Sequence, residues 1–378
     1  MTKLLKQQNQ KQIPIVDLAL QYKSIQSEIE TVVQEVLSSG HYILGPNVET
    51  FESELANYLG CKHVISCANG TDAITLSLMA LGIKKDDEVI TVSHSFFATS
   101  EAIALVGAKP VFVDINESDF NIDPRKIESL ITKKTKAIIP VHLYGGACEI
   151  SSVTEIAKKH GLFVIEDCAQ ALGAKYKGKF VGAFGDVGTV SFFPTKNLGA
   201  FGDGGAIFTQ DENTAKKIKQ LRSHGSSERY VHHFIGLNSR LDEIQAAILR
   251  VKLKYLDNWN SARQRAAKYY DELLKNIGDI VIPAVKPNTH HIFHQYTIRT
   301  KKRDLIYEGL RKLNIESLIY YPIPIHLQKA FSYLGYKKGS LPVTEQICSE
   351  ILSLPIYPEI TPEIQEYIVE QIKDILSN

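Results

Sequence analysis

Short apolar runs alternate with segments of helical periodicity along this chain, and that alternation predicts its fold. Apolar runs of strand length occur at residues 63–66, 88–92, 110–115, 137–141 and 162–167. The segments between them repeat apolar residues every three or four positions, as one face of a helix does. Strands joined by helix-length crossovers run parallel, with helices on both faces of the sheet. We therefore expect an α/β fold with a mostly parallel central sheet.

The same periodicities predict the remaining elements. We expect helices at 25–36 (ending at Gly40), at 48–59, 72–81 and 97–108, and from Asp211 onwards. Two more strands, at 187–193 and 205–209, are expected around a loop that contains Lys196. A long helix after Asp242 then leads into strands at 290–300 and 315–326 and helices at 343–352 and 362–376.

Length and pattern together predict two domains. At 378 residues the chain exceeds one typical hydrophobic core. We expect a polar N-terminal tail at 1–12, a large cofactor-binding domain at 13–253 and a smaller α+β domain at 254–378. The tail has neither the apolar stretch nor the small-residue cleavage site of a signal peptide.

Composition and charge exclude several classes of protein. The chain is 44% hydrophobic and 22% charged, which is typical of a soluble globular protein. A net charge of +1 gives no reason to expect nucleic acid or a membrane as a partner. No apolar run approaches the roughly 20 residues of a membrane span. Five scattered cysteines without a C-x-x-C pair predict reduced thiols in a cytoplasmic protein.

Two residues that follow apolar strands carry the candidate chemistry. One strand ends at Asp167, and Lys196 lies in the glycine-rich segment SFFPTKNLGAFGDGGA. Pyridoxal phosphate (PLP) requires such a pair, because the lysine forms a Schiff base and the acid holds the pyridine nitrogen protonated. Each residue alone also fits a plain surface position. The glycines around Lys196 and the apolar neighbours of Asp167 favour burial, and with it the cofactor hypothesis.

Other strand ends supply further residues for this hypothetical site. The turn Asn69–Asp72 leads into a helix whose N-terminus would attract a phosphate, although it could also be a simple capped turn. Phe96 or Phe97 is placed to cover a flat ring. Gln170 is placed to bond the phenolate oxygen of the ring, and Ser191 to share the phosphate. Carboxyl ends of parallel strands meet at one edge of a sheet, so we expect a single site.

Two other ligand classes fit the sequence less well. GAFGDVG has the wrong glycine spacing for dinucleotide binding, and GDGG does not open a helix. The histidines His290, His291 and His294 raise the possibility of zinc. In an alternating strand, however, His291 would point away from the other two, and no carboxylate lies nearby. We expect structural or substrate-contact roles for these histidines and no bound metal.

The ordered segments CANGTDA, SHSFFAT, IPVHLYG, IEDCAQALGA, SFFPTKNLGAFGDGGA, IGLNSRLDEIQAAIL, HQYTIRT and YYPIPIHLQ carry a family resemblance. From about Ile13 to the C-terminus the chain resembles the DegT/DnrJ/StrS family of PLP-dependent nucleotide-sugar aminotransferases, which have the aspartate aminotransferase-like fold (fold type I). The resemblance implies that Lys196 forms the Schiff base and moves the proton. It implies that Asp167 pairs with the pyridine nitrogen and that Gln170 contacts the phenolate oxygen.

The resemblance also implies further contacts. Phe96 would stack on the cofactor ring, and the phosphate would be bound by Gly70, Thr71, Asp72, Ser191 and Asn238. Asn238 would come from the neighbouring subunit, so the protein would be a homodimer with active sites at its interface. The sugar-nucleotide cleft would be lined by Tyr320, His326 and Arg222.

The implied activity transfers the amino group of L-glutamate to a nucleotide-linked 3-keto-6-deoxyhexose, with dTDP as the expected nucleotide. The product would be a 3-amino-3,6-dideoxyhexose, made by a ping-pong reaction through pyridoxamine phosphate. Lys196 argues against the family's dehydratases, which have histidine there. PTKNLGAFGDGG and SHSFFAT resemble the enzymes that act at carbon three, although Ser95 and Phe97 depart from their pattern. A 4-keto-sugar aminotransferase and a non-catalytic PLP-binding regulator remain the alternatives.

Overall fold

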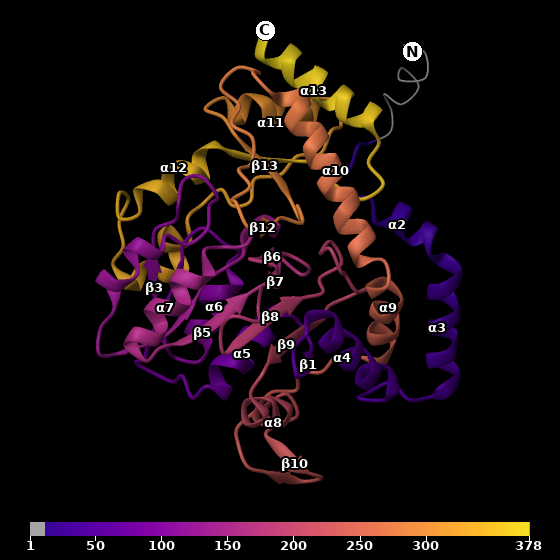
Figure 1. The fold of residues 1–378 in the computed structure, drawn as a ribbon, viewed down its shortest axis with the longest axis vertical. Coiled ribbons are helices and arrows are strands. Elements are labelled where there is room, and N and C mark those ends of the chain that lie inside the picture. Colours follow the sequence, from indigo (N-terminus) through magenta and orange to yellow (C-terminus); the bar gives the residue numbers. More distant parts are fainter. Residues whose placement is uncertain (1–11, 378) are drawn as a thin grey trace.

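The computed structural model describes residues 12–377, so the predicted tail lies almost wholly outside the described residues. Figure 1 shows a broad lower lobe around a twisted sheet and a smaller upper lobe formed by the C-terminal part of the chain. A hairpin that contains β10 projects from the bottom of the lower lobe.

The lower lobe is organised by a seven-stranded sheet of order β1-β9-β8-β5-β4-β2-β3. Its strands are β1 His63–Cys67, β2 Glu88–Val92, β3 Lys109–Val113, β4 Thr135–Ile139, β5 Phe163–Asp167, β8 Val187–Ser191 and β9 Gly205–Thr209. Neighbours from β8 to β3 pair in parallel, and only β9 runs antiparallel to its neighbours β1 and β8. The prediction of an α/β fold with a mostly parallel sheet is confirmed.

Helices cover both faces of this sheet because successive strand side chains point to opposite sides. In β4, for example, Ile138 joins the core beneath α4, α7 and α9, whereas Ala137 and Ile139 join the core beneath α5 and α6. The helices of this lobe are α2 Leu18–Ser24, α3 Gln26–Ser39, α4 Pro46–Leu59, α5 Gly70–Ala80, α6 Ala98–Leu105, α7 Ile150–His160, α8 Glu212–Leu221 and α9 Glu243–Leu253. Short 3₁₀ turns η1 Pro124–Lys126, η2 Glu128–Leu130 and η3 Leu143–Gly145 lie in its connections.

The upper lobe has its own buried cluster, to which α10, α11, α13, β13 and β14 contribute. Its elements are α10 Leu256–Leu274, β13 Tyr296–Arg299, α11 Arg303–Lys312, η4 Ile325–Leu327, η5 Lys329–Leu334, α12 Pro342–Glu350, β14 Ile351–Leu354 and α13 Pro362–Ser377. The predicted long helix after Asp242 is therefore two helices, α9 and α10, which break at Lys254 and Tyr255. The predicted boundary at 253/254 falls at this break, and the division into domains stays a prediction.

One strand prediction in this lobe is wrong. Residues 315–326 form no strand, only two isolated bridges, from Ile315 to Ile13 and from Leu318 to Ser353. Pro322 and Pro324 lack the N–H groups that a sheet ladder needs. The partner of β13 is instead β14, an apolar run that the sequence pattern placed at the end of a helix.

Two small antiparallel sheets complete the described chain. β6 Lys175–Tyr176 pairs with β7 Lys179–Phe180 and with β12 Thr289–His290, and β10 Ser226–Glu228 pairs with β11 Val231–His232. No helix within residues 12–377 is both long and apolar enough to span a lipid bilayer.

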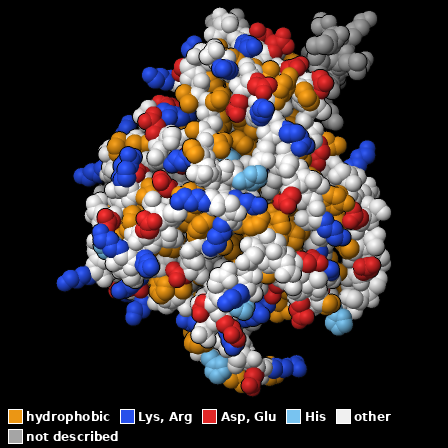
Figure 2. All heavy atoms as spheres, in the orientation of Figure 1, with side chains coloured by type: hydrophobic (Ala, Val, Ile, Leu, Met, Phe, Trp, Pro, Cys, Tyr) orange, Lys and Arg blue, Asp and Glu red, His pale blue; other side chains and the backbone are white. Residues whose placement is uncertain are grey.

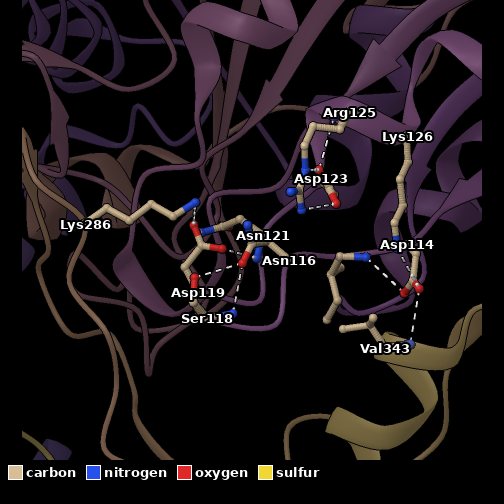
Figure 3. Close-up of polar contacts among 11 residues, drawn as sticks. Asp114, Asn116, Ser118, Asp119, Asn121, Asp123, Arg125, Lys126, Lys286 and Val343 are labelled. Atoms are coloured by element: carbon tan, nitrogen blue, oxygen red, sulfur yellow. Dashed lines mark hydrogen bonds and ion pairs between the residues drawn. The ribbon is translucent and has the colours of Figure 1, made fainter.

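An acidic loop after β3 ties the two lobes together (Figure 3). Asp114 accepts hydrogen bonds from the backbone N–H groups of Val343 (3.2 Å) and Thr344 (2.8 Å), at the start of α12. Asp119 pairs with Lys286 at 2.7 Å. The carboxylates of this loop are already bonded to backbone amides and cations, so they hold the lobes in register rather than offering a cluster of free ligands.

Candidate active site

A cavity of about 640 Å³ lies beyond the carboxyl ends of the parallel strands. This position follows from the topology, because parallel strands deliver their ends to one edge of the sheet. Residues after β1, β2, β5 and β8 line it, together with Tyr320 and its neighbours from the upper lobe. Nine of the predicted site residues line this cavity: Gly70, Thr71, Asp72, Phe96, Asp167, Gln170, Ser191, Lys196 and Tyr320. The other three, Arg222, Asn238 and His326, do not.

Lys196 lies in the loop that follows β8, and burial changes its acidity. Desolvation lowers the pKa of its amine to about 8, and the negative charge of Asp167 opposes that lowering. A lysine with this pKa has a substantial fraction of free amine near neutral pH, whereas an ordinary lysine has almost none. The environment of Lys196 therefore favours its use as a nucleophile or base.

The loop around Lys196 is held tightly by backbone and buried side chains. Gly199 has room for no side chain, since a Cβ there would lie 2.2 Å from the carbonyl oxygen of Pro194. The ammonium of the buried Lys252 donates to the Gly199 carbonyl oxygen at 2.5 Å. Asn197 is buried directly after Lys196 and bonds to Asn260 and His294. These contacts fix the backbone that carries the reactive amine.

Asp167 occupies the last position of β5 and faces the cavity. Its Oδ2 accepts a hydrogen bond from the hydroxyl of Thr99 at 2.7 Å, and its Oδ1 accepts one from the N–H of Ala169 at 3.0 Å. Two donors on a buried carboxylate hold it in place for a positively charged partner in the cavity. Sequence reasoning missed Thr99, although it lies in the SHSFFAT segment, one helical turn after Ser95.

Glu166, one residue earlier, points to the opposite side of β5 and has a different role. It is fully buried and accepts hydrogen bonds from His142 Nε2 (2.9 Å) and from the N–H groups of Gly182, Phe184 and Gly185 (2.7 Å each). Four donors saturate both oxygens. Glu166 therefore pins the loop before β8, and only Asp167 remains to act in the cavity.

One buried group among the described residues resembles a metal site: His142, Glu166 and Cys168 place a ligand atom each within 4.8 Å of one another. Its hydrogen bonds argue against a metal. His142 Nδ1 accepts from the N–H of Cys148 at 3.1 Å, so Nε2 must carry the proton that it donates to Glu166. Burial also raises the pKa of the Cys168 thiol well above its usual value. The His142–Glu166 hydrogen bond and the protonated Cys168 thiol therefore do not offer a set of free metal ligands.

The N-terminus of α5 forms the other end of the cavity. Asn69 caps this helix through a 2.8 Å bond from the N–H of Asp72 to its Oδ1. Gly70 packs so closely on Ser191 that a Cβ would lie 2.7 Å from the Cβ of that serine. The close packing brings the Ser191 hydroxyl to the positive end of the helix, where a phosphate would bind well.

Phe96 and Gln170 lie in the same cavity, next to Tyr321. The Phe96 ring is 57% exposed and lies 5.9 Å from the ring of Tyr321. Gln170 accepts from the N–H of Tyr144 at 2.8 Å and donates to the Tyr321 hydroxyl at 3.1 Å. An exposed aromatic face and an oriented amide fit one flat heteroaromatic ring. The family resemblance named the adjacent Tyr320 from this upper-lobe segment but not Tyr321, and both line the cavity.

The three predicted residues outside the cavity have other partners. His326 is buried between Ser93 Oγ (2.7 Å) and Glu345 (3.1 Å), and Arg222 is buried against Glu52 and the carbonyl oxygen of Ser66. Asn238 is exposed at the foot of the β10–β11 hairpin. Their expected contacts with substrate or with a neighbouring subunit stay predictions.

The three histidines proposed from the sequence as a group are separated by a turn at Phe293, whose φ is +46°. Gln264 contacts His290, the N–H of Phe293 donates to His291, and Asn197 contacts His294. Of these three histidines, only His294 lines the cavity. The next residue, Gln295, lines it as well. The three histidines thus have separate partners, and the expectation that they bind no metal stays a prediction.

The cavity has few positive charges of its own. Asp72, Glu101, Asp167 and Asp203 line it, and Lys196 is the only Lys or Arg among the described residues that do. One helix N-terminus can bind one phosphate, but a substrate with two more phosphates would face this excess of carboxylates. Cations for such a substrate must come from outside this wall.

Comparison with known proteins places the chain among aminotransferases, in agreement with the lysine and carboxylate that line the cavity. The model of the DegT/DnrJ/EryC1/StrS aminotransferase family matches residues 23–373. A pleiotropic regulatory protein of Geobacillus stearothermophilus is 51% identical over 96% of this chain and 98% of its own. A dTDP-3-amino-3,6-dideoxy-alpha-D-galactopyranose transaminase of Aneurinibacillus thermoaerophilus is 48% identical over 95% of this chain and 98% of its own.

A solved structure is similar throughout its length. The crystal structure of DesV from S. venezuelae in complex with a ketimine intermediate superposes with a TM-score of 0.95 at 40% identity, over 97% of this chain and 99% of that one. The family model covers residues 23–373, and each of these matches covers at least 95% of the chain at 40–51% identity. The chain belongs to the DegT/DnrJ/EryC1/StrS aminotransferase family.

Proposed function

We propose that this protein is a PLP-dependent aminotransferase that converts a nucleotide-linked 3-keto-6-deoxyhexose to the 3-amino sugar. One observation carries the proposal: a lysine of lowered pKa, a strand-end carboxylate and a helix N-terminus line the same cavity. These are the groups that the carbonyl, ring nitrogen and phosphate of PLP require. The close packing of Gly70 on Ser191 leaves space for a phosphate at the helix N-terminus, and the exposed Phe96 ring offers a face for a flat ring.

When bound, PLP supplies an electrophilic carbon for amines and a ring that accepts electrons from a carbanion. The chain's own residues supply the rest. Lys196 Nζ would provide the amine that reacts with PLP, and the same amine would serve as the base that accepts the α-carbon proton of the amino donor and as the acid that gives it up again. Asp167, held by Thr99, keeps the ring nitrogen protonated. The α5 N-terminus and Ser191 anchor the phosphate, so the ring stays fixed while the proton moves.

The lowered pKa of Lys196 predicts how the rate of covalent PLP binding by the cofactor-free protein depends on pH. Below about pH 8 the rate should rise about tenfold per pH unit, because only the free amine reacts, and above pH 8 it should level off. Stopped-flow absorbance from pH 6 to 10 measures this rate. N-acetyl-lysine amide under the same conditions corrects for the titration of PLP itself. A rate that still climbs tenfold per unit beyond pH 9 would show an ordinary lysine.

L-Glutamate as amino donor and dTDP as nucleotide belong to the same proposal. The carbon-three assignment is supported by the GDGG form of the lysine loop, and the nucleotide by the name of the Aneurinibacillus relative. Incubation with dTDP- and UDP-linked 3-keto and 4-keto sugars, followed by mass spectrometry of the amino sugars, tests both choices. Amination of a 4-keto substrate alone would overturn the carbon-three assignment, and exclusive use of UDP sugars would overturn the nucleotide.

A non-catalytic regulator is the second candidate, and the name of the Geobacillus relative favours it. Intact Lys196 and Asp167 argue for catalysis. The discriminating measurement is the release of 2-oxoglutarate from glutamate by the purified protein, which a PLP-binding regulator would not support. The five free cysteines support a reducing, cytoplasmic compartment for either activity.

The proposal of a homodimer is supported by the exposed side chains of the projecting β10–β11 hairpin. Figure 2 shows hydrophobic, basic, acidic and histidine side chains at the bottom of the molecule, where the hairpin that contains β10 projects. Ile235 is 91% exposed and Tyr230 is 81% exposed, which is unusual for large apolar side chains on an isolated surface. Arg229, His232 and His233 on the same hairpin are exposed as well. Glu228 offsets the charge of Arg229 on this hairpin, so its exposed apolar side chains are what favour a seat on a second copy of this chain.

Ile235→Asp should therefore weaken self-association. A charge placed in a buried apolar contact should raise the dimer dissociation constant at least about 30-fold, as the loss of a strong interface contact does. Analytical ultracentrifugation over a range of concentrations measures the constant. Leu305→Asp is a control, because Leu305 is also exposed but lies on α11 of the upper lobe and does not line the cavity. Equal association of wild type and Ile235→Asp would contradict a role for the hairpin.

A further inference from the structure

Tyr144 is buried behind the cavity and bonds to two residues of its wall. Its N–H donates to Gln170 Oε1 at 2.8 Å, and its hydroxyl donates to the backbone carbonyl oxygen of Tyr320 in the upper lobe. The backbone of Tyr144 has a φ of +58°, in the left-handed region that residues other than glycine seldom adopt. Such a conformation persists where the surrounding contacts determine it, and it is concentrated at functional positions. Tyr144 does not itself line the cavity, so it acts on the site through these contacts.

The Tyr144 hydroxyl is part of a chain of hydrogen bonds whose direction is fixed. His94 Nε2 lies 3.0 Å from the hydroxyl oxygen, and His94 Nδ1 lies 3.4 Å from the sulfur of Cys348. The carbonyl oxygen of Tyr320 can only accept, so the single proton of the hydroxyl is directed at it. His94 Nε2 must therefore donate to the hydroxyl oxygen. Burial lowers the pKa of His94 to about 3, so the ring is neutral and Nδ1 has a lone pair.

The thiol of Cys348 completes this relay. Burial raises the pKa of the thiol, so it keeps its proton and donates it to His94 Nδ1. Cys348 belongs to α12 of the upper lobe, whereas His94 follows β2 and Tyr144 lies in η3 of the lower lobe. The relay thus begins and ends in the upper lobe and passes through two buried side chains of the lower lobe. Each donor in it has one acceptor, so the relay joins the lobes in a single arrangement.

The segment that the relay holds supplies an aromatic wall of the cavity. Tyr320 and Tyr321 line the cavity, and the ring of Tyr321 lies 5.9 Å from the ring of Phe96. The Tyr321 hydroxyl accepts from Gln170 Nε2 at 3.1 Å, while Gln170 Oε1 accepts the N–H of Tyr144. A backbone N–H can only donate, so the Gln170 amide has one orientation, with Oε1 toward Tyr144 and Nε2 toward Tyr321.

We propose that His94 and Tyr144 are positioning residues for this aromatic wall. Tyr144 holds the Tyr320 carbonyl oxygen with its hydroxyl and the Gln170 amide with its N–H. His94 occupies the oxygen of that hydroxyl with an N–H, which leaves the hydroxyl proton for the Tyr320 carbonyl. The wall is then ordered before a flat cofactor ring binds, and binding loses less conformational freedom. The catalytic consequence rests on the proposed function, whereas the relay is a property of the cofactor-free protein.

The direction of the relay can be measured on the cofactor-free, full-length protein. Nitrogen-15 NMR of histidine-labelled protein should show His94 protonated on Nε2 and unprotonated on Nδ1, unchanged between pH 6 and pH 8 because its pKa is about 3. His94→Gln identifies the resonance by its absence. In Tyr144→Phe the ring loses its acceptor, so the Nε2–H tautomer should no longer be exclusive. A His94 ring protonated on Nδ1 in the wild-type protein would overturn the proposal, whatever the variants do.

Tyr144→Phe tests the positioning role, and Tyr270→Phe is its matched control. Tyr270 is also buried, and its hydroxyl also donates to a backbone carbonyl oxygen, that of Pro355 at 3.0 Å, but it does not line or contact the cavity wall. Both variants lose one buried hydroxyl and should lower the urea midpoint of unfolding to a similar extent. Only Tyr144→Phe should weaken the binding of pyridoxamine phosphate, which needs no covalent link to Lys196. The expected loss is about tenfold, or about 1.4 kcal/mol.

Hydrogen exchange measures the order of the wall without any ligand. The N–H of Ile325, five residues after Tyr320, donates to the Ser93 carbonyl oxygen at 3.0 Å. Its exchange should be at least about tenfold faster in Tyr144→Phe than in the wild type and unchanged in Tyr270→Phe. Equal affinity of wild type and Tyr144→Phe for pyridoxamine phosphate, or an equal loss in both variants, would overturn the proposal. A wild-type protein that bound no pyridoxamine phosphate would contradict the proposed function instead, and the tautomer and the exchange rates would still decide whether the relay orders the wall.

Discussion

Replacement of Lys196 with alanine is expected to abolish transamination and the absorbance band of covalently bound PLP. Two functions are lost together. The amine that forms the covalent link is gone, and so is the base that moves the proton, a contribution of about 10²- to 10⁴-fold by itself. We expect the rate of amino transfer from glutamate to fall by about 10⁴-fold or more. Absorbance spectra and the release of 2-oxoglutarate measure both losses.

The chain offers its own control for this result. Lys252 is a second buried lysine whose pKa burial lowers to about 8, but its ammonium is directed at the Gly199 carbonyl oxygen. Lys252→Met should keep the covalent band and lose activity only in part, through a less well ordered loop. If Lys196→Ala kept the band and Lys252→Met lost it, the two lysines would have been assigned the wrong roles.

The parallel-sheet pattern explains how much of this site was predictable. Once short apolar runs were assigned to parallel strands, their ends had to meet at one edge, and Asn69, Phe96, Asp167 and Ser191 are all within a few residues of such ends. Lys196 was found the same way, after the strand that became β8. These positions depend on local pattern and on one topological rule, both of which a sequence contains.

Residues that reach the site from a distance were not predictable in this way. Tyr321 and His294 come from the upper lobe, and their places depend on how the two lobes pack. Thr99 lies close in sequence to Phe96, but its bond to Asp167 spans 68 positions. His326 was expected in the substrate cleft, yet Ser93 and Glu345 bury it, a pairing that no periodicity reveals. Long-range hydrogen bonds are the part of a fold that local patterns do not encode.

Asp167→Asn is expected to separate catalysis from folding. Loss of a buried ionic partner should slow amino transfer about 10²- to 10³-fold, if breaking the pair costs about 3 to 4 kcal/mol. The fold should tolerate the change, because its two hydrogen-bond partners adapt. The N–H of Ala169 can still donate to the remaining oxygen, and the Thr99 hydroxyl, which can donate or accept, can turn to receive the new amide N–H. Activity and urea unfolding of the cofactor-free protein are the two measurements.

Glu166→Gln, one residue away, should give the opposite result. Three of its four donors are backbone N–H groups, at Gly182, Phe184 and Gly185, and a backbone N–H cannot turn to accept. Each oxygen of Glu166 accepts two of the four donors, so two donors would meet the NH₂ group of the new amide, at a cost of about 3 kcal/mol in unfolding free energy. The protein that does fold should keep most of its activity, since Glu166 faces away from the cavity. Comparable loss of activity in both variants, or comparable loss of stability, would refute this division of labour between two adjacent carboxylates at the end of β5.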